Sequence, residues 1–113
     1  MKKPQNLAMP PVLIQRLITM GERIARMRKA RSLLQAEAAL RANISRETAS
    51  RIENGDAAIA IGQIVRYLDV IAPGVDLAHL YNTNDPALAI LDKTEKRQRA
   101  RRRNPKELAK YDF

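Results

Sequence analysis

Between residues 45 and 54, polar and apolar side chains alternate at the spacing of a helix. On a helical wheel of residues 46–53, Ala49 and Ile52 point to one side together with Ile44. The opposite side carries a polar strip, formed by Arg46, Glu47, Ser50 and Arg51. Arginine can donate two hydrogen bonds to guanine O6 and N7, glutamate can accept one from cytosine N4, and serine is permissive. The strip is therefore suited to contact base edges in the major groove of DNA.

The residues at the two ends of this helix support the assignment. Ser45 has the type of an N-cap, and Asn54-Gly55 is a strong turn signal. Thr48 can reach a phosphate or pack its methyl group against thymine, and the free N–H groups at the helix start favour a nearby phosphate. Pairing of Glu47 with Arg51 at i,i+4 is an alternative that contributes only a few tenths of a kcal/mol. That pairing would leave Arg46 as the main base contact.

A strip of this kind needs a second helix and a tight turn to position it. Residues 35–42 predict a short Ala-rich helix, and Asn43 after it favours the left-handed conformation that ends helices. Two short helices joined by a tight turn, the second capped and polar on its outer face, describe a helix-turn-helix. We place this motif at residues 35–53.

The first predicted helix begins near Pro11, because proline suits the first turn of a helix. One of its faces is apolar at steps of four and three residues, formed by Leu13, Leu17, Met20, Ile24 and Met27. Gly21 weakens the middle of this helix and predicts a break or a kink. Core packing is the plain interpretation of the apolar face, and a dimer seam formed by its first half is the alternative.

The remainder of the chain also reads as helical. A further amphipathic helix ends at Pro73-Gly74 and has an apolar face of Ile61, Ile64, Val65, Leu68 and Ile71. A helix of one to two turns is expected at 75–81, and Asp85-Pro86 opens another as N-cap and first residue. No alternating β pattern of useful length occurs. The predicted fold class is all-α.

The 113-residue chain has a formal net charge of +9, which is unevenly placed. Residues 12–31 carry a net charge of +5 and residues 92–106 one of +6, whereas residues 32–53 hold three basic and three acidic side chains. Two basic blocks therefore flank a nearly neutral middle. Because phosphate contacts position a protein on DNA without reading its sequence, we expect the blocks to supply affinity and the strip to supply specificity.

Two stretches resemble a known family. Met20-Gly-Glu-Arg-Ile-Ala-Arg-Met-Arg-Lys-Ala-Arg-Ser-Leu-Leu-Gln-Ala-Glu is similar to the opening of the lambda-repressor-like, Cro-type (XRE) helix-turn-helix family. Asn43-Ile-Ser-Arg-Glu-Thr-Ala-Ser-Arg-Ile-Glu-Asn-Gly resembles its recognition helix and the following turn. The resemblance spans residues 20–72 and implies a five-helix DNA-binding domain, usually a homodimer that represses at a two-fold operator.

The resemblance also implies roles for particular residues. Gln35 corresponds to a residue that holds a phosphate, and Asn54 to a backbone contact just past the recognition helix. The recognition strip comprises Ser45, Arg46, Glu47, Thr48, Ser50 and Arg51. Small Cro-type proteins with a tail beyond the fifth helix resemble antitoxins paired with HipA-like kinases. An autorepressing antitoxin with such a toxin as partner is therefore a finer expectation.

Several positions depart from the family pattern. Leu34 stands where a Ser or Thr N-cap is usual, Ala60 cannot cap the fourth helix, and Asn43 replaces the turn glycine. Ala38 and Ala49 stand where larger apolar residues are usual. The two motif helices should therefore either lie closer together or have the gap filled by side chains from residues 12–31.

The run Lys93 to Arg103 has three interpretations. A disordered, solvated tail is the default for a block of like charge. The second is a DNA arm, in which each phosphate contact steepens the salt dependence by about 0.9 log unit, with Arg97, Arg99, Arg101, Arg102 and Arg103 as the candidate contacts. The third is a partner-binding segment anchored by Tyr111 and Phe113. The chain thus divides into an arm (1–11), a helix-turn-helix domain (12–81) and a basic extension (82–113).

The residue inventory argues against other functions. The chain has no Cys, one His and no Gly-rich phosphate loop, so we expect no enzyme, no metal site and no cofactor. Its apolar runs are far shorter than the ~18 residues of a membrane span, and no signal-peptide core is present. We therefore expect a cytoplasmic protein, associated with the bacterial nucleoid when it binds double-stranded DNA. The alternative is a module whose basic surface and tail bind a partner protein without reading DNA sequence.

Overall fold

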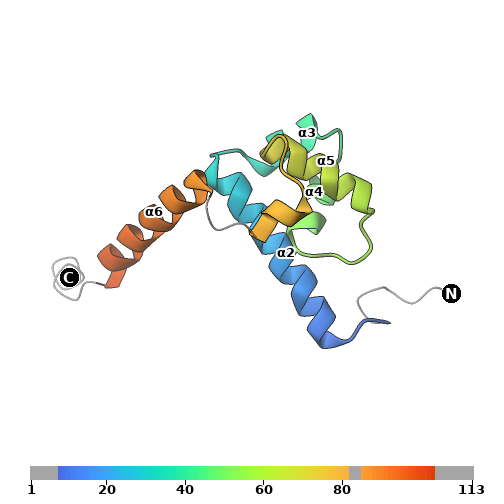
Figure 1. Cartoon of the computed structure of the whole chain (residues 1–113), viewed down its shortest axis with the longest axis horizontal. Helices are drawn as coiled ribbons and strands as arrows, with labels where there is room; N and C mark the ends of the chain where they lie inside the picture. The colour runs from blue at the N-terminus through green and yellow to red at the C-terminus, as the bar shows by residue number, and fades with distance from the viewer. Residues whose placement is uncertain (1–7, 82–84, 104–113) are drawn as a thin grey trace, which may run out of the picture.

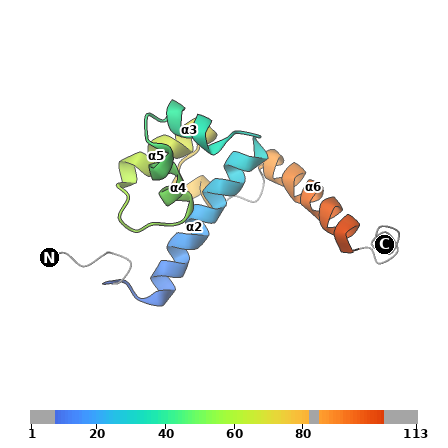
Figure 2. The same ribbon diagram turned by 180° about the vertical axis from the view of Figure 1, so that it is seen from behind.

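The computed structural model describes residues 8–81 and 85–103. This part of the chain forms α2 (Pro11–Ala30), α3 (Gln35–Arg41), α4 (Arg46–Glu53), α5 (Ile61–Ile71), the 3-10 helix η1 (Leu77–Tyr81) and α6 (Pro86–Arg103). These described residues contain no strand, and the all-α prediction is confirmed. α2 runs through the middle, with α3, α4 and α5 on one side and α6 extending away on the other (Figure 1, Figure 2).

α2 runs from Pro11 to Ala30 without interruption, so the predicted break at Gly21 is wrong. Gly21 is buried, and a Cβ atom there would lie 2.6 Å from the carbonyl oxygen of Glu53 and 2.7 Å from the nitrogen of Gly55. Gly55, at φ +75°, lies in turn against the backbone of Leu17 and Ile18. The missing side chain therefore allows a close approach between α2 and the end of α4.

The core lies where α2, α3, α4 and α5 meet. Ala38 of α3 and Ala49 of α4 are both fully buried, and Ile24 and Met27 of α2 belong to the same buried cluster. The small residues of the two motif helices thus lie in one buried cluster with side chains from α2 and α5.

The apolar face predicted for α5 is partly wrong. Ile64, Leu68 and Ile71 are buried as expected, but Ile61 is 67% exposed and Val65 is 48% exposed. Tyr67, which the apolar pattern passed over, is fully buried. Its position completes the i, i+3, i+4, i+7 spacing from residue 64, which defines the face of α5 that meets the core.

The predicted turns and caps are mostly confirmed. Asn43 adopts the left-handed conformation, with φ +57°. The side chain of Ser45 caps α4, whereas Leu34 and Ala60 provide no side-chain cap for α3 and α5. At the start of α6, Asp85 Oδ1 accepts a hydrogen bond of 2.9 Å from the backbone N–H of Ala87. Side-chain caps thus mark the starts of α4 and α6.

The interpretation of residues 93–103 as a disordered tail is wrong, because α6 continues to Arg103. Lys, Arg, Gln and Ala are good helix formers, and ion pairs with α2 hold the first half of α6 in place. None of the helices within the described residues is long and apolar enough to cross a membrane.

Candidate nucleic-acid interface

α4 presents the predicted polar strip to the outside. Ala49 and Ile52 are buried beneath it, while Arg46, Glu47 and Arg51 are exposed. Ser50 and Thr48 are partly exposed at the edges of the strip. Burial of the two apolar side chains fixes the rotation of α4 about its axis, so the structure brings all the predicted strip residues to one surface.

The first turn of α4 is closed by two hydroxyl groups. Ser45 Oγ accepts a hydrogen bond of 3.0 Å from the backbone N–H of Thr48 and donates one of 2.9 Å to Thr48 Oγ1. A capping bond of this type stabilises a helix start by about 1 kcal/mol. The pair orders the N-terminal end of α4, next to Arg46.

Arg51 pairs with Asp56 and not with Glu47. Its Nε lies 2.7 Å from Asp56 Oδ2, and Asp56 Oδ1 also accepts the backbone N–H of Ala58 at 2.8 Å. The hydrogen bond with Asp56 raises the pKa of Arg51, and the same bond lowers the pKa of Asp56. The alternative pairing considered from the sequence is thus replaced by one that turns Arg51 toward the loop after α4.

Arg46 differs from Arg51 in its surroundings. Across residues 8–81 and 85–103, no acidic side chain forms an ion pair with Arg46, and the residue is exposed. A guanidinium group in this state keeps all its donors for an outside partner. Arg46 is therefore the side chain of the strip that is best prepared to contact a base.

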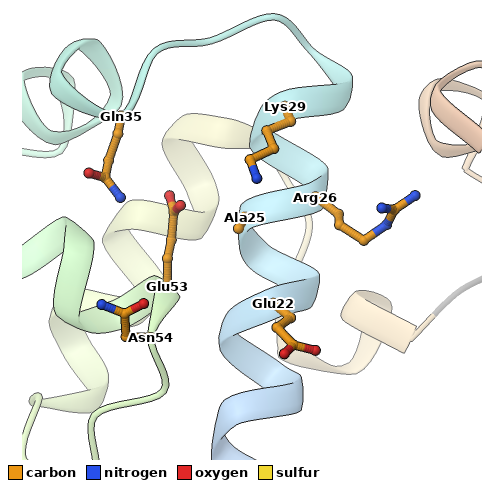
Figure 3. A pocket seen from close by; sticks show the side chains of 7 residues that line it. All are labelled: Glu22, Ala25, Arg26, Lys29, Gln35, Glu53 and Asn54. Carbon is orange, nitrogen blue, oxygen red and sulfur yellow. The ribbon is translucent and has the colours of Figure 1, made fainter. Parts of the chain in front are cut away.

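Gln35 and Asn54, the two predicted backbone contacts, border one open cleft. Gln35 is the first residue of α3, Asn54 follows α4, and Lys29 of α2 lies across from them. In Figure 3 the amide of Gln35 points toward the Glu53 carboxylate, and Lys29 extends toward the same place from α2. The Asn54 amide nitrogen donates to Ser50 Oγ at 3.5 Å. The cleft thus gathers two amides, one carboxylate and one ammonium group at the edge of the α3–α4 motif.

A partly buried ion pair lies beside this cleft, and its acidic partner, Glu53, lines the cleft. The Arg28 guanidinium bonds both carboxylate oxygens of Glu53, at 2.7 and 2.9 Å, and the carbonyl of Leu33 at 2.9 Å. The Tyr67 hydroxyl donates a third hydrogen bond to Glu53. Burial alone would raise the pKa of Glu53, but the hydrogen bonds from Arg28 and Tyr67 outweigh it and the pKa is lowered. Glu53 therefore stays ionised, and its charge is compensated by Arg28.

Most of the basic block of residues 12–31 is engaged within the molecule. Besides Arg28, Arg26 pairs with Asp92 at 2.6 Å and Glu95 at 2.8 Å, and Arg31 pairs with Asp85 at 2.9 Å. The Arg23 guanidinium stacks over the Tyr81 ring at 4.3 Å. The expected attraction of this block for DNA is thus confined largely to its two exposed cations, Arg16 and Lys29.

The second basic block is exposed. Arg97, Arg99 and Arg101 project from α6, which extends away from the rest of the described chain (Figure 2). Arg102 and Arg103 belong to the same helix, but their side chains lie outside the described residues, as do Tyr111 and Phe113. Three of the five candidate arginines of the DNA-arm interpretation are thus exposed in the described structure.

Sequence reasoning missed three residues that shape this surface. Asp56 sets the direction of Arg51, Arg28 neutralises Glu53, and Lys29 faces the cleft. Pairing between Arg28 and Glu53 spans 25 positions along the chain, so no local spacing could have indicated it. Among the described residues, no group of three or more potential metal ligands occurs.

The comparisons with known proteins agree with this geometry. Residues 24–72 match a family model described as helix-turn-helix, and the match covers α3, α4, α5 and the second part of α2. Searches among curated proteins and among solved structures returned no match. The matched family binds DNA and is not enzymatic. Residues 24–72 thus form a helix-turn-helix domain that is similar to the Cro/C1-type (XRE) DNA-binding domains of transcriptional regulators.

Proposed function

We propose that the protein is a sequence-specific transcriptional repressor that binds a two-fold DNA operator as a homodimer. The observation that carries this proposal is the outward strip of α4, capped by Ser45 and backed by the buried side chains of Ala49 and Ile52. Helices of this type enter the major groove with their N-terminal residues against the base edges. Arg46, at the first position of α4, then makes the main contact with a base edge.

The other residues of the strip supply secondary contacts. Glu47 accepts a hydrogen bond from cytosine N4, and Arg51, oriented by Asp56, donates to guanine. Ser45, Thr48 and Ser50 contact phosphate or base groups with their hydroxyls. Gln35 and Asn54 hold the phosphate backbone beside the cleft, so that α4 enters the groove in a fixed register.

The exposed half of α6 supplies nonspecific affinity. Arg97, Arg99 and Arg101 bind phosphates of flanking DNA and release counterions, as do Arg102 and Arg103. This contribution is independent of sequence. It accelerates the search for the operator without selecting it.

The dimer contact we propose uses the first half of α2. Val12 is 58% exposed, and the residues after it remain partly exposed although they are apolar, namely Leu13, Ile14, Leu17 and Ile18. These residues precede the matched family region, which begins at residue 24. A symmetric pairing of this segment would bury an apolar surface that otherwise faces water.

A narrower proposal is that the repressor is the antitoxin of a toxin–antitoxin operon with a HipA-like kinase as toxin. It rests on the family resemblance of small Cro-type proteins with a C-terminal extension. Tyr111 and Phe113 are the proposed anchors for the kinase. Co-expression with the product of the neighbouring gene tests this role: restored growth that depends on Tyr111 and Phe113 is expected, and toxicity unaffected by the protein would contradict it.

The DNA-reading function is tested by selecting duplexes from a random pool with the full chain. We expect recovery of a shared two-fold motif, and loss of that motif when Arg46→Ala is used instead. Recovery of no motif by the wild-type chain, together with capture of an acidic partner protein, would favour the alternative of an interaction module. The selected duplex is then the probe for measurements of affinity and salt dependence.

A further inference from the structure

One face of α2 borders the cleft that holds Gln35 and Asn54. This face carries Glu22, Ala25, Arg26 and Lys29. Lys29 extends into the cleft, whereas the guanidinium of Arg26 points the other way, toward α6 (Figure 3). Two cations one turn apart on the same rim therefore have opposite orientations.

α6 is the element that turns Arg26 away from the cleft. Arg26 Nη2 lies 2.6 Å from Asp92 Oδ1 and 2.8 Å from Glu95 Oε1, both on α6. The helix is kept beside α2 by the Arg31–Asp85 pair and by packing of Leu88 on the core. The two carboxylates consequently stay within reach of Arg26.

The Arg26 side chain is held by charge more than by burial. It is 38% exposed, and its acidic partners Asp92 and Glu95 are 57% and 33% exposed. Ion pairs between exposed groups are weak and are easily exchanged for another anion. Arg26 can therefore leave α6 when its two carboxylates are removed or displaced.

Two carboxylates border the cleft, and neither prevents a further cation from entering it. Glu53 is compensated by the bidentate bond from Arg28. Glu22 points away from Gln35 and Asn54 (Figure 3). Lys29 is thus the cation that faces the cleft in the described structure, and Arg26 is the nearest one held back from it.

We propose that α6 restrains DNA binding by holding Arg26 out of the cleft in which Lys29, Gln35 and Asn54 contact a DNA phosphate. This inference rests on the proposed function and adds a control to the same site. The ligand is a phosphodiester of duplex DNA. When α6 releases Arg26, the guanidinium swings over the rim and adds one cationic contact. Lys29 is a phosphate contact in both states.

The test is a double-mutant cycle with the full chain on the selected duplex. Asp92→Asn/Glu95→Gln is measured in the wild-type background, in an Arg26→Gln background and in a matched Arg16→Gln background. Because Arg16 is an exposed cation of α2, its removal changes the net charge equally. The general effect of removing two negative charges appears in every background and cancels in the cycle.

In the wild-type and Arg16→Gln backgrounds, we expect the acid substitutions to increase affinity at least threefold beyond the gain in the Arg26→Gln background. The salt slope should steepen there by about 0.9 log unit, the contribution of one phosphate contact. Arg26→Gln alone should stay within twofold of wild type, whereas Lys29→Gln should flatten the slope by about 0.9. Equal gains in all three backgrounds would overturn the inference alone, and a wild-type chain without sequence-specific binding would overturn the proposed function as well.

Discussion

The basic side chains of α2 and those of the second half of α6 have opposite surroundings. In α2, Arg28 is buried against Glu53, and Arg26 and Arg31 pair with acids of the α6 segment. In α6, Arg97, Arg99 and Arg101 are exposed. The first group joins elements of the fold, and the second remains available to an outside anion. Side chains of the same charge therefore have different roles: those of α2 connect parts of the fold that hold α4, whereas those of α6 are the ones we propose to bind DNA phosphates.

The largest effect on stability is expected from Arg28, whose side chain pairs with Glu53 inside the fold. Its side chain is 11% exposed and that of Glu53 is 7% exposed. Arg28→Ala would leave a buried carboxylate without its charge partner, and breaking such a pair costs about 3 kcal/mol of unfolding free energy. Urea unfolding measures this loss.

The matched control for Arg28→Ala is Arg97→Ala on α6. As a surface substitution away from packed features, it should change the unfolding free energy by no more than about 0.5 kcal/mol. Equal losses in the two variants would remove the distinction between the two groups of cations.

Gly21 provides a second test of the role of α2 as a scaffold. A Cβ atom at this position would meet the backbone of Glu53 and Gly55 at 2.6–2.8 Å, where no flexible side chain can yield. Gly21→Ala should therefore cost about 2 kcal/mol of stability through overpacking. Gly62→Ala in α5 is the control, because nothing lies within 4 Å of its Cβ, and it should stabilise by about 0.5 kcal/mol. Thermal or urea unfolding of both variants checks the sign, and a neutral Gly21→Ala would contradict the close approach.

Replacing the three described arginines of α6 together tests whether this helix contacts DNA. Arg97→Gln/Arg99→Gln/Arg101→Gln should leave the unfolding free energy nearly unchanged. If each arginine contacts one phosphate, the slope of log affinity against log salt should flatten by about 2.7. A salt titration on the selected duplex measures this. An unchanged slope would show that α6 does not contact DNA.

A smaller effect is expected from pH. Because the pKa of Glu53 is lowered in the folded state, its contribution to stability is fully present above its ordinary pKa of 4.5 and is lost as the pH falls through the lowered value. The unfolding free energy should accordingly decrease below about pH 4.5. In Glu53→Gln this decrease should be shallower, which urea unfolding between pH 3 and 6 can show. A slope equal to that of wild type would mean that Glu53 is not paired in the fold.

The helices and the α4 strip could be predicted because their signals are local. The N-cap Ser45, the left-handed Asn43 and the spacing of Ala49 and Ile52 each lie within a few residues of what they control. The buried position of Tyr67 was missed because its hydroxyl made it look polar. In the structure that hydroxyl bonds Glu53, 14 positions away in the chain.

The sequence also could not show which charged side chains stay unpaired, because their partners lie far away along the chain. Arg26 and Asp92 are 66 positions apart, and Arg31 and Asp85 are 54 apart. Composition counts all of these groups equally, while the fold cancels some of them. Gly21 is a parallel case: helix propensity predicted a break, but the backbone of Glu53 and Gly55 across from it decides its role.

We propose that α4 contacts bases, that α6 contacts phosphates and that the paired cations of α2 support the fold. The most direct test uses three full-length variants that each remove one cation: Arg46→Ala, Arg97→Ala and Arg31→Ala. Affinity is measured at one salt concentration for the selected duplex and for an unrelated duplex. We expect Arg46→Ala to lose about 1–3 kcal/mol of binding free energy on the selected duplex alone. Arg97→Ala should weaken binding to both duplexes equally, and Arg31→Ala should weaken binding to neither by more than twofold. Equal changes in all three variants would show that only net charge matters, and would contradict base reading by α4.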